Sequence, residues 1–233
     1  MKLPISRRLL ACAAYVRPGA RVADVGTDHG YLGIYLLREG IAASVCASDL
    51  REQPLEKART NASRYGTADR MTFRCCDGLS SVAAGSVDTV VCAGMGADCI
   101  LAILAAAPWL KTERTYLVLQ PQSSGQDLRR TLCAEGFAIL RETLVEDGGF
   151  LYTVLEARYT GEPVRLSPGA QYVSPQLRES SSPLLPHYLR RLTASMEKTV
   201  RGLRQGGDAE KLAYYETALR ELRELEAEYG QSL

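Results

Sequence analysis

The sequence predicts an α/β fold in which a mostly parallel, Rossmann-like sheet ends in an antiparallel strand and a helical hairpin follows. Three observations lead to this prediction. Short β-branched runs alternate with helical segments over residues 21–135, which is the pattern of successive βαβ units. Two strand-like runs joined by a glycine-rich turn follow at 137–157. A leucine pattern of helical period then occupies residues 185–225.

The first element is a helix over residues 4–16, where apolar and basic positions recur at helical spacing until Pro18 and Gly19 stop it. Buried strands are expected where short β-branched runs are bounded by turn residues, at 21–25, 44–48, 71–74, 87–93 and 115–120. The segments between them predict helices at 30–39, 53–65, 97–107 and 125–135. This alternation predicts a parallel sheet covered by helices on both faces.

The pattern changes after Gly136. Residues 137–145 and 150–157 form two strand-like runs, and Glu146-Asp-Gly-Gly149 between them is a hairpin signal. A class I methyltransferase sheet ends in such an antiparallel hairpin, whereas a nicotinamide-binding Rossmann domain would normally continue with another crossover helix. The sequence therefore favours methyl transfer.

The C-terminal part predicts a separate helical unit. Residues 159–186 are rich in Pro, Ser and Gly and are interpreted as a linker. Two helical leucine patterns follow, separated by Gln205-Gly-Gly-Asp208, in which Asp208 is a candidate N-cap. They predict an antiparallel helical hairpin or short coiled coil. We expect a catalytic domain over residues 1–160, and a linker plus helical hairpin over 161–233.

Composition limits the possible functions. The 233 residues carry a net charge of +1, so any nucleic-acid binding must use local patches. The seven cysteines contain no C-x-x-C pair, which argues for a reducing compartment and against a structural zinc site. The apolar run at 9–16 is too short for an export signal, and no run approaches a membrane span. We expect a cytoplasmic protein that uses no metal and contacts no membrane, with a monomer favoured.

The segment from Val22 to Gly30 is a candidate cofactor loop. A strand runs into Gly26, and Gly30 starts the next helix, so the backbone can turn tightly and approach a ligand. Asp24 and Asp28 flank the first glycine in a D-x-G-x-x-x-G pattern. Two carboxylates would repel a pyrophosphate, but they suit a cofactor that carries an ammonium and a sulfonium. The pattern thus favours S-adenosylmethionine over a dinucleotide.

Other acidic and glycine positions follow the later strands. Asp49 closes the second strand, where an acidic residue can bind ribose hydroxyls, and Asp77 follows the third, where it can meet an adenine amino group. A lone Asp in such a position is more often solvated or capping a helix. Here, however, the loop after the first strand, Asp49, Asp77 and Ala93-Gly-Met-Gly96 each follow a different predicted strand at the same end, which favours one shared site. The candidate cofactor-binding residues are Asp24, Gly26, Asp28, His29, Gly30, Asp49, Leu50, Asp77, Gly78, Leu79, Ala93, Gly94, Met95 and Gly96.

These motifs together resemble the bacterial tRNA (adenine(22)-N(1))-methyltransferases, the TrmK family. The resemblance is carried by Leu9, Val22–Leu32, Ala47–Asp49, Pro54-Leu55, Arg74-x-x-Asp-Gly-Leu79, Ala93-Gly-Met-Gly96 and Leu119-Gln-Pro121, and it covers about residues 3–158. It implies S-adenosylmethionine as cofactor, tRNA as substrate, and a C-terminal coiled-coil domain. The chain departs from the family pattern at Gly30, Gly33, Ala97 and Gln122.

The chemistry narrows the catalytic candidates. The chain lacks the Asn/Asp-Pro-Pro-aromatic motif of enzymes that methylate exocyclic amines. A ring nitrogen such as adenine N1 has an available lone pair and needs alignment more than a strong base. Asp28 is the first candidate to stabilise the cationic ring or accept the N6 proton, with helix capping as its alternative role. His29 and Met95 complete the catalytic set, although structural support and packing are the alternatives. Tyr31 can also flank the base, and Gln120 and Gln122 can read an adenine edge or simply hold a rigid turn.

Two groups of arginines are candidates for tRNA binding. Arg7 and Arg8 belong to a basic N-terminal segment, and Arg190, Arg191, Arg201 and Arg204 fall on the first helix of the predicted hairpin. The second hairpin helix is acidic, so mutual neutralisation across the pair is the alternative. Two other functions stay open: a methyltransferase acting on a small molecule or protein, and a non-enzymatic RNA-binding relative.

Overall fold

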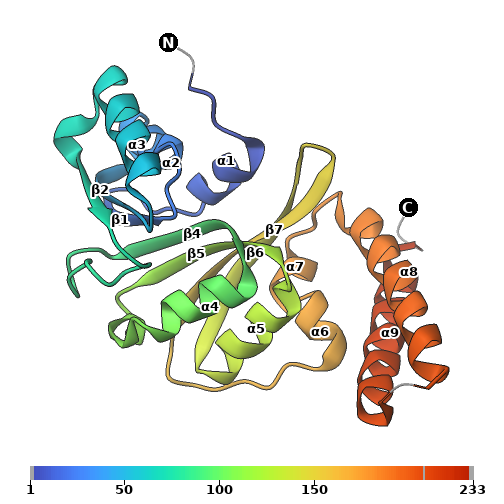
Figure 1. Cartoon of the computed structure of the whole chain (residues 1–233). Coiled ribbons are helices and arrows are strands. Elements are labelled where there is room, and N and C mark those ends of the chain that lie inside the picture. Colours follow the sequence, from blue (N-terminus) through green and yellow to red (C-terminus); the bar gives the residue numbers. More distant parts are fainter. Residues whose placement is uncertain (1–2, 207, 231–233) are drawn as a thin grey trace.

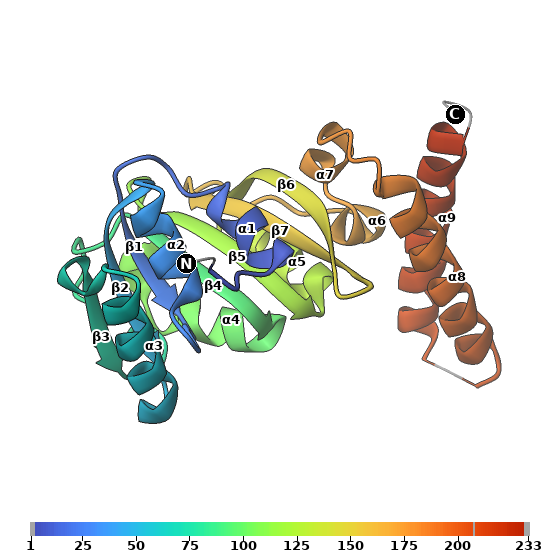
Figure 2. The same cartoon turned by 90° about the horizontal axis from the view of Figure 1, so that it is seen from above.

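The fold is a seven-stranded sheet with helices on both faces and a pair of long helices beside one edge (Figures 1 and 2). The structure is a computed structural model, and it describes residues 3–206 and 208–230. The strands lie in the order β3-β2-β1-β4-β5-β7-β6. The first five pair in parallel and β7 is antiparallel to both neighbours, as the sequence predicted.

The strands and helices occur where the hydrophobic patterns placed them. The strands are β1 (Ala20–Val25), β2 (Ala42–Asp49), β3 (Met71–Cys75), β4 (Thr89–Gly96), β5 (Tyr116–Ser123), β6 (Phe137–Asp147) and β7 (Phe150–Tyr159). The helices around them are α1 (Arg7–Ala13), α2 (Tyr31–Arg38), α3 (Glu52–Arg64), α4 (Ala97–Ala105) and α5 (Gly125–Ala134), with short 3-10 turns at Ala68–Arg70 and Pro108–Leu110.

The core consists of one apolar layer on each face of the sheet. Along β1, Ala23 and Val25 contribute to the layer under α4 and α5, whereas Val22 contributes to the layer under α1, α2 and α3. This alternation follows from the two-residue period of a strand. Both faces of β1 are thus buried from Val22 onward, which explains why its residues other than Arg21 and Asp24 are apolar.

The β6–β7 hairpin extends past the rest of the sheet. β5 and β7 pair only from Tyr116↔Arg158 to Leu119↔Leu155, whereas β6 and β7 remain paired to Asp147↔Phe150. The extra length lies at the edge where the parallel strands end, and Figure 1 shows it rising beside α1. The hairpin turn is therefore near the edge where open α/β sheets bind ligands.

The segment interpreted as a linker, 159–186, is more ordered than expected. It contains α6 (Pro168–Tyr172) and α7 (Pro175–Glu179), which precede the long helices α8 (Leu185–Arg204) and α9 (Ala209–Gly230). Ser167 and Ser174 cap α6 and α7, and a proline follows each cap at the first helical position. The Ser and Pro content that suggested a linker is thus the chemistry of two helix starts.

A buried ion pair joins the sheet to this C-terminal region. The Arg129 side chain is 1% exposed and binds both carboxylate oxygens of Glu142 in β6. It also donates to the Gln171 carbonyl oxygen at 3.1 Å, and the Ser174 hydroxyl donates to Glu142 at 2.6 Å. Together these bonds connect α5, β6, α6 and the start of α7.

Within residues 3–206 and 208–230, no helix has the length and apolar character needed to cross a membrane. The same residues contain no group of three or more His, Cys, Asp or Glu side chains arranged to hold a metal ion.

Candidate active site

A cavity of about 410 Å³ opens at the carboxyl ends of β1, β2 and β4. Its walls come from α1, from the loop between β1 and α2 and the start of α2, and from the ends of β2, β4 and β5. The lining residues are Arg8, Leu9, Asp24, Gly26, Thr27, Asp28, His29, Tyr31, Leu32, Asp49, Arg51, Ala93, Gly94, Met95 and Gln122. Most of the candidate residues that follow β1, β2 and β4 therefore lie around one space.

The loop after β1 has a conformation that requires glycine. The amides of Gly26 and Thr27 donate to the Ser48 carbonyl oxygen at 2.8 and 3.1 Å, which folds the loop onto the end of β2. Gly26 has φ +70°, and a Cβ there would lie 2.3 Å from the Met95 Cε atom. A side chain at this position would be strained by the backbone and would push the flexible end of the Met95 side chain aside. Gly26 thus lets the loop after β1 pack closely against the end of β4.

Asp24 is a buried carboxyl at the bottom of the cavity. It is 5% exposed, and the Thr27 hydroxyl donates to its Oδ2 atom at 2.6 Å. Burial raises the pKa of Asp24 to about 6, and the nearby charge of Asp49 acts in the same direction, against the hydrogen bonds from Thr27 and the Gly33 backbone. A cation placed here would relieve this unfavourable burial of charge. The cavity bottom therefore suits a positively charged ligand.

Asp28 and His29 form a neighbouring pair in the cavity lining. Asp28 has φ +48°, its side chain is 68% exposed, and its Oδ2 atom lies 3.4 Å from His29 Nε2. The backbone of His29 is held by Asn61, whose amide donates to the His29 carbonyl oxygen at 3.0 Å. In the described residues, the Asp28 carboxylate makes no hydrogen bond to the first turn of α2. Helix capping is therefore not its role in this structure.

The irregular end of β4 is held by a buried glutamine. Gln120 is fully buried, and its Oε1 atom accepts from the Gly94 amide at 3.0 Å and from Arg8 Nη1 at 2.7 Å. Its Nε2 atom donates to the Pro121 carbonyl oxygen at 2.8 Å. Gln120 is thus occupied by the protein and does not read an adenine edge, contrary to one of our interpretations. Gln122 lines the cavity and keeps that possibility.

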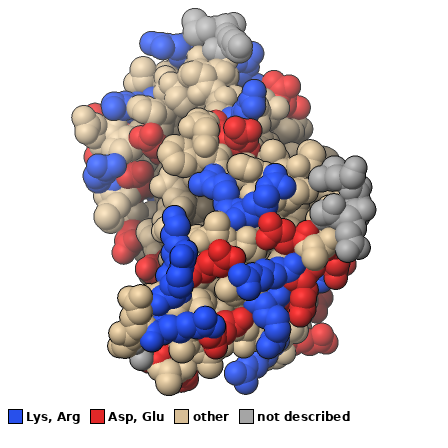
Figure 3. Space-filling model, turned by 90° about the vertical axis from the view of Figure 1, so that its right-hand side faces the viewer, with Lys and Arg blue, Asp and Glu red and all other residues tan. Residues whose placement is uncertain are grey.

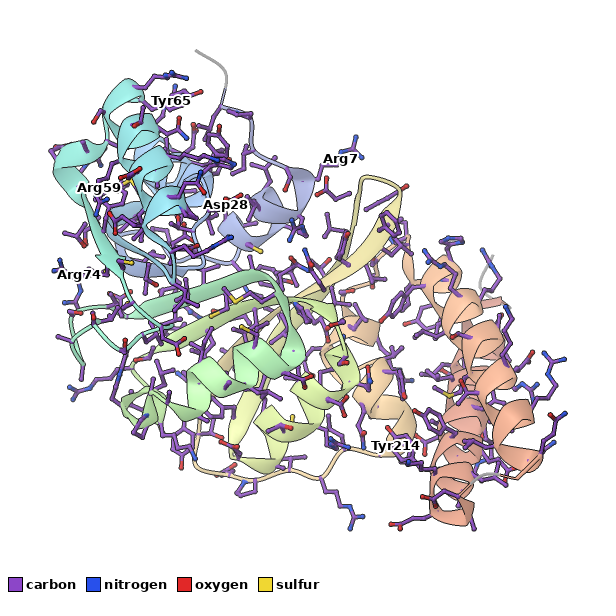
Figure 4. The ribbon with its side chains drawn as sticks, in the orientation of Figure 1. Arg7, Asp28, Arg59, Tyr65, Arg74 and Tyr214 are labelled. Carbon is purple, nitrogen blue, oxygen red and sulfur yellow. The ribbon has the colours of Figure 1, made fainter. Side chains whose placement is uncertain are left out.

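Arg8 lies inside this arrangement and not on an open basic face. Its side chain is 21% exposed, its Nε atom is 3.8 Å from Asp147 Oδ2, and its guanidinium carbon is 5.5 Å from the centre of the Tyr152 ring. Arg8 thereby connects α1, β5 and the β6–β7 hairpin. Arg7, by contrast, is exposed and points outward near the hairpin (Figure 4).

The candidate residues that follow β3, at 77–79, are not among the residues that line the cavity. Asp77 is exposed in a turn, and Leu79 is buried in the core. Gly78 has φ +52°, and a Cβ added to it would lie 2.9 Å from the Ile103 side chain. The Ser48 hydroxyl donates to the Gly78 carbonyl oxygen at 3.0 Å, so the turn is attached to the end of β2. Other expected site residues that do not line the cavity are Gly30, Leu50 and Gly96, of which Leu50 is 70% exposed.

Sequence reasoning missed several lining residues, including Leu9, Thr27, Leu32 and Arg51. Thr27 lies within the predicted loop and Arg51 is two positions after Asp49, so proximity to predicted site residues is a usable signal for both. The bond between Arg8 and Gln120 spans 112 positions, and no local pattern indicates it.

The candidate tRNA-binding arginines of the C-terminal region lie on α8. Figure 3 shows this face, where Lys and Arg side chains form bands between acidic ones. Arg204 pairs with Glu216 at 2.6 Å, and Arg223 pairs across the helix pair with Glu197 at 2.7 Å, so part of the charge is neutralised. Arg190, Arg191 and Arg201 are exposed and form no ion pair within the described residues.

Comparisons with known proteins agree with this geometry. A family model described as a methyltransferase domain matches residues 5–155. The tRNA (adenine(22)-N(1))-methyltransferase of Bacillus subtilis is 30% identical over 205 residues, which are 85% of this chain and 84% of that protein.

Solved structures extend the similarity over almost the whole chain. The crystal structure of the B. subtilis m1A22 tRNA methyltransferase TrmK has a TM-score of 0.80 at 27% identity, covering 97% of each chain. The Streptococcus pneumoniae protein Sp1610, solved in complex with S-adenosyl-L-methionine, has a TM-score of 0.79 at 28% identity and covers 92% of this chain and 99% of that one. The coverage includes the C-terminal helices.

Proposed function

Since the chain belongs to the TrmK family of tRNA (adenine(22)-N(1))-methyltransferases, we propose that it transfers a methyl group from S-adenosylmethionine to N1 of adenine 22 in tRNA. The observation that carries the proposal is the cavity at the ends of β1, β2 and β4, where glycine-containing segments meet the acidic side chains of Asp24, Asp28 and Asp49. It lies at the sheet edge where this fold class binds its ligands.

The residues around the cavity fit the cofactor. Asp24 and Asp49 supply negative charge for its ammonium and ribose hydroxyls, and the absence of a side chain at Gly26 lets the ligand approach the backbone. Leu50 and Asp77 lie on the turns that follow β2 and β3, and we propose that they contact the adenine ring of the cofactor. We assign the same ligand to the remaining candidates, namely Asp28, His29, Gly30, Gly78, Leu79, Ala93, Gly94, Met95 and Gly96.

The bound cofactor supplies the electrophilic methyl group, and this chain supplies alignment and charge. The N1 lone pair lies in the plane of adenine, so catalysis depends on holding that atom in line with the methyl group. Methylation makes the ring cationic. We propose that Asp28, exposed at the rim, stabilises this charge or accepts the N6 proton, that His29 orients Asp28, and that Met95 packs against the reacting groups.

The tRNA is expected to lie across the cavity edge and the face of α8. Arg7 contributes from α1, and Arg190, Arg191, Arg201 and Arg204 contribute from α8, whereas Arg8 acts indirectly by holding Gln120 and the hairpin. The target base must leave its stack to reach the cavity, because N1 is otherwise inaccessible. We further propose that the enzyme acts as a monomer in the cytoplasm, and light scattering of the purified protein tests the monomer.

The decisive experiment incubates the protein with unmodified tRNA and labelled S-adenosylmethionine and then maps reverse-transcription stops. A stop at adenine 22 is the expected result. Labelled RNA without such a stop, or no labelled RNA, would contradict the proposal, and failure to bind the cofactor in calorimetry would favour a non-enzymatic RNA-binding protein. Transfer of label to a small molecule or protein instead would favour the other alternative.

Two sets of variants test the residue assignments. Asp28→Ala should lower kcat by a larger factor than it lowers cofactor affinity, and near-normal turnover would remove Asp28 from the mechanism. Reversing the charge of Arg190, Arg191 and Arg201 should weaken tRNA binding without changing cofactor affinity. Lys211→Glu, an exposed charge reversal on α9, is the matched control.

A further inference from the structure

The tip of the β6–β7 hairpin, residues 146–150, presents an aromatic side chain to solvent. Phe150 is 60% exposed, and Gly148 and Gly149 form the turn that precedes it. The Tyr152 ring lies behind it with a centroid distance of 6.4 Å. Single exposed apolar residues are common on protein surfaces. This one differs by its position, because it stands on the strand extension that reaches past β5 at the cavity edge.

The base of the hairpin is firmly held although its tip is exposed. Leu144 is buried in the apolar cluster of α7, α8 and α9, and Val145 packs against the cluster that includes α1. Arg8 reaches from the cavity wall to Asp147 and Tyr152. Phe150 is therefore carried on a supported projection that Arg8 connects to the cavity wall.

The charges of the tip distinguish between two modes of RNA contact. The tip contains two acidic residues, Glu146 and Asp147. Glu146 is exposed, whereas Asp147 lies near Arg8. Such a tip is poorly suited to bind phosphate groups, which are negatively charged. An aromatic ring, however, stacks on a nucleobase irrespective of its sequence. The ligand that fits the tip is thus an unstacked base, while Arg7 beside the hairpin is available for the phosphate backbone (Figure 4).

We propose that Phe150 stacks on a tRNA nucleobase next to the target adenine and occupies the space which that adenine leaves when it enters the cavity. This inference rests on the proposed function. Extruding a base costs its stacking and pairing energy, and proteins that distort nucleic acids frequently insert apolar side chains between bases to offset that cost. The supported hairpin places such a side chain at the edge of the cavity that receives the base.

The test compares Phe150→Ala, Phe150→Leu and Phe150→Trp in steady-state kinetics on tRNA. Stacking of one base on an aromatic side chain is lost on substitution by alanine, so kcat/KM should fall about 5- to 150-fold. Leu retains apolar surface without a ring and should restore little, whereas Trp should restore most of the activity. Val164→Ala, which removes a side chain that is 53% exposed elsewhere, is the matched control.

Two further measurements separate stacking from a structural role. Cofactor affinity and melting temperature should be unchanged in Phe150→Ala, because the side chain is exposed. A tRNA carrying 2-aminopurine at position 22 should brighten on binding wild type, and Phe150→Ala should reduce that increase. Wild-type kinetics for Phe150→Ala, or equal rescue by Leu and Trp, would overturn the stacking role alone. A wild-type protein without the stop at adenine 22 would instead overturn the proposed function, and this inference with it.

Discussion

Replacing Arg129 by methionine should destabilise the protein strongly, because Arg129 is the partner of a fully buried carboxylate. The substitution removes the two-pronged bond to Glu142 and the bonds to the Gln171 carbonyl at 3.1 Å and to Thr153 at 3.3 Å. Among the described residues, Glu142, whose side chain is 0% exposed, would then keep a hydrogen bond from Ser174 alone. Breaking a buried pair from one side typically costs about 3–5 kcal/mol.

That cost is large against a total stability of about 5–15 kcal/mol. For a chain of this size, it corresponds to a fall of about 6–20 °C in melting temperature. Thermal and urea unfolding followed by circular dichroism measure it directly. Adding Glu142→Gln to Arg129→Met should recover at least half of the loss, because no unpaired charge then stays buried. Arg223→Met, which breaks the exposed pair with Glu197, should melt close to wild type. A wild-type melting temperature for Arg129→Met would refute this reasoning.

Three other substitutions test the cavity. Gly26→Ala should weaken cofactor binding about tenfold or more in calorimetry, because its Cβ strains the loop and displaces the end of Met95, which lines the cavity, whereas Gly40→Ala, with a similar φ of +68° and open space around it, should not. Burial holds the pKa of Asp24 at about 6, above the ordinary 3.8. The free protein should therefore lose stability as pH rises from about 4 to 6 while cofactor affinity increases, and Asp24→Asn should flatten both profiles. Arg8→Met should lower kcat about tenfold or more by releasing Gln120 and Gly94. Arg7→Met should instead weaken tRNA binding and reduce the salt dependence of that binding. Equal effects of the two arginine substitutions would contradict their separate roles.

The periodicity of the sequence was enough to predict the sheet and its helices, because short β-branched runs and amphipathic segments report burial directly. The antiparallel hairpin was equally readable from its Gly148-Gly149 turn. The helices α6 and α7 were missed because Ser-Pro pairs occur both in linkers and at helix starts, and only the caps of Ser167 and Ser174 distinguish the two.

The candidate site was partly predictable for a related reason. Asp24, Gly26 and Asp49 follow strands whose carboxyl ends must meet in a parallel sheet, so topology alone places them around one cavity. The function of Gln120 was not predictable, because its partners Arg8 and Gly94 lie on other elements. Polar side chains that satisfy one another across long sequence separations leave no periodic pattern in the sequence.

The strand β6 has a consequence for how the enzyme selects its substrate. At Glu142 and Leu144 it is bonded to and packed against the region that carries α8, and a few residues later it forms the hairpin beside the cavity. One continuous strand therefore connects the region that carries the α8 arginines to the hairpin beside the cavity. If α8 and the cavity both contact tRNA, as proposed, this connection would favour RNA whose folded shape reaches both, without any reading of the bases in between.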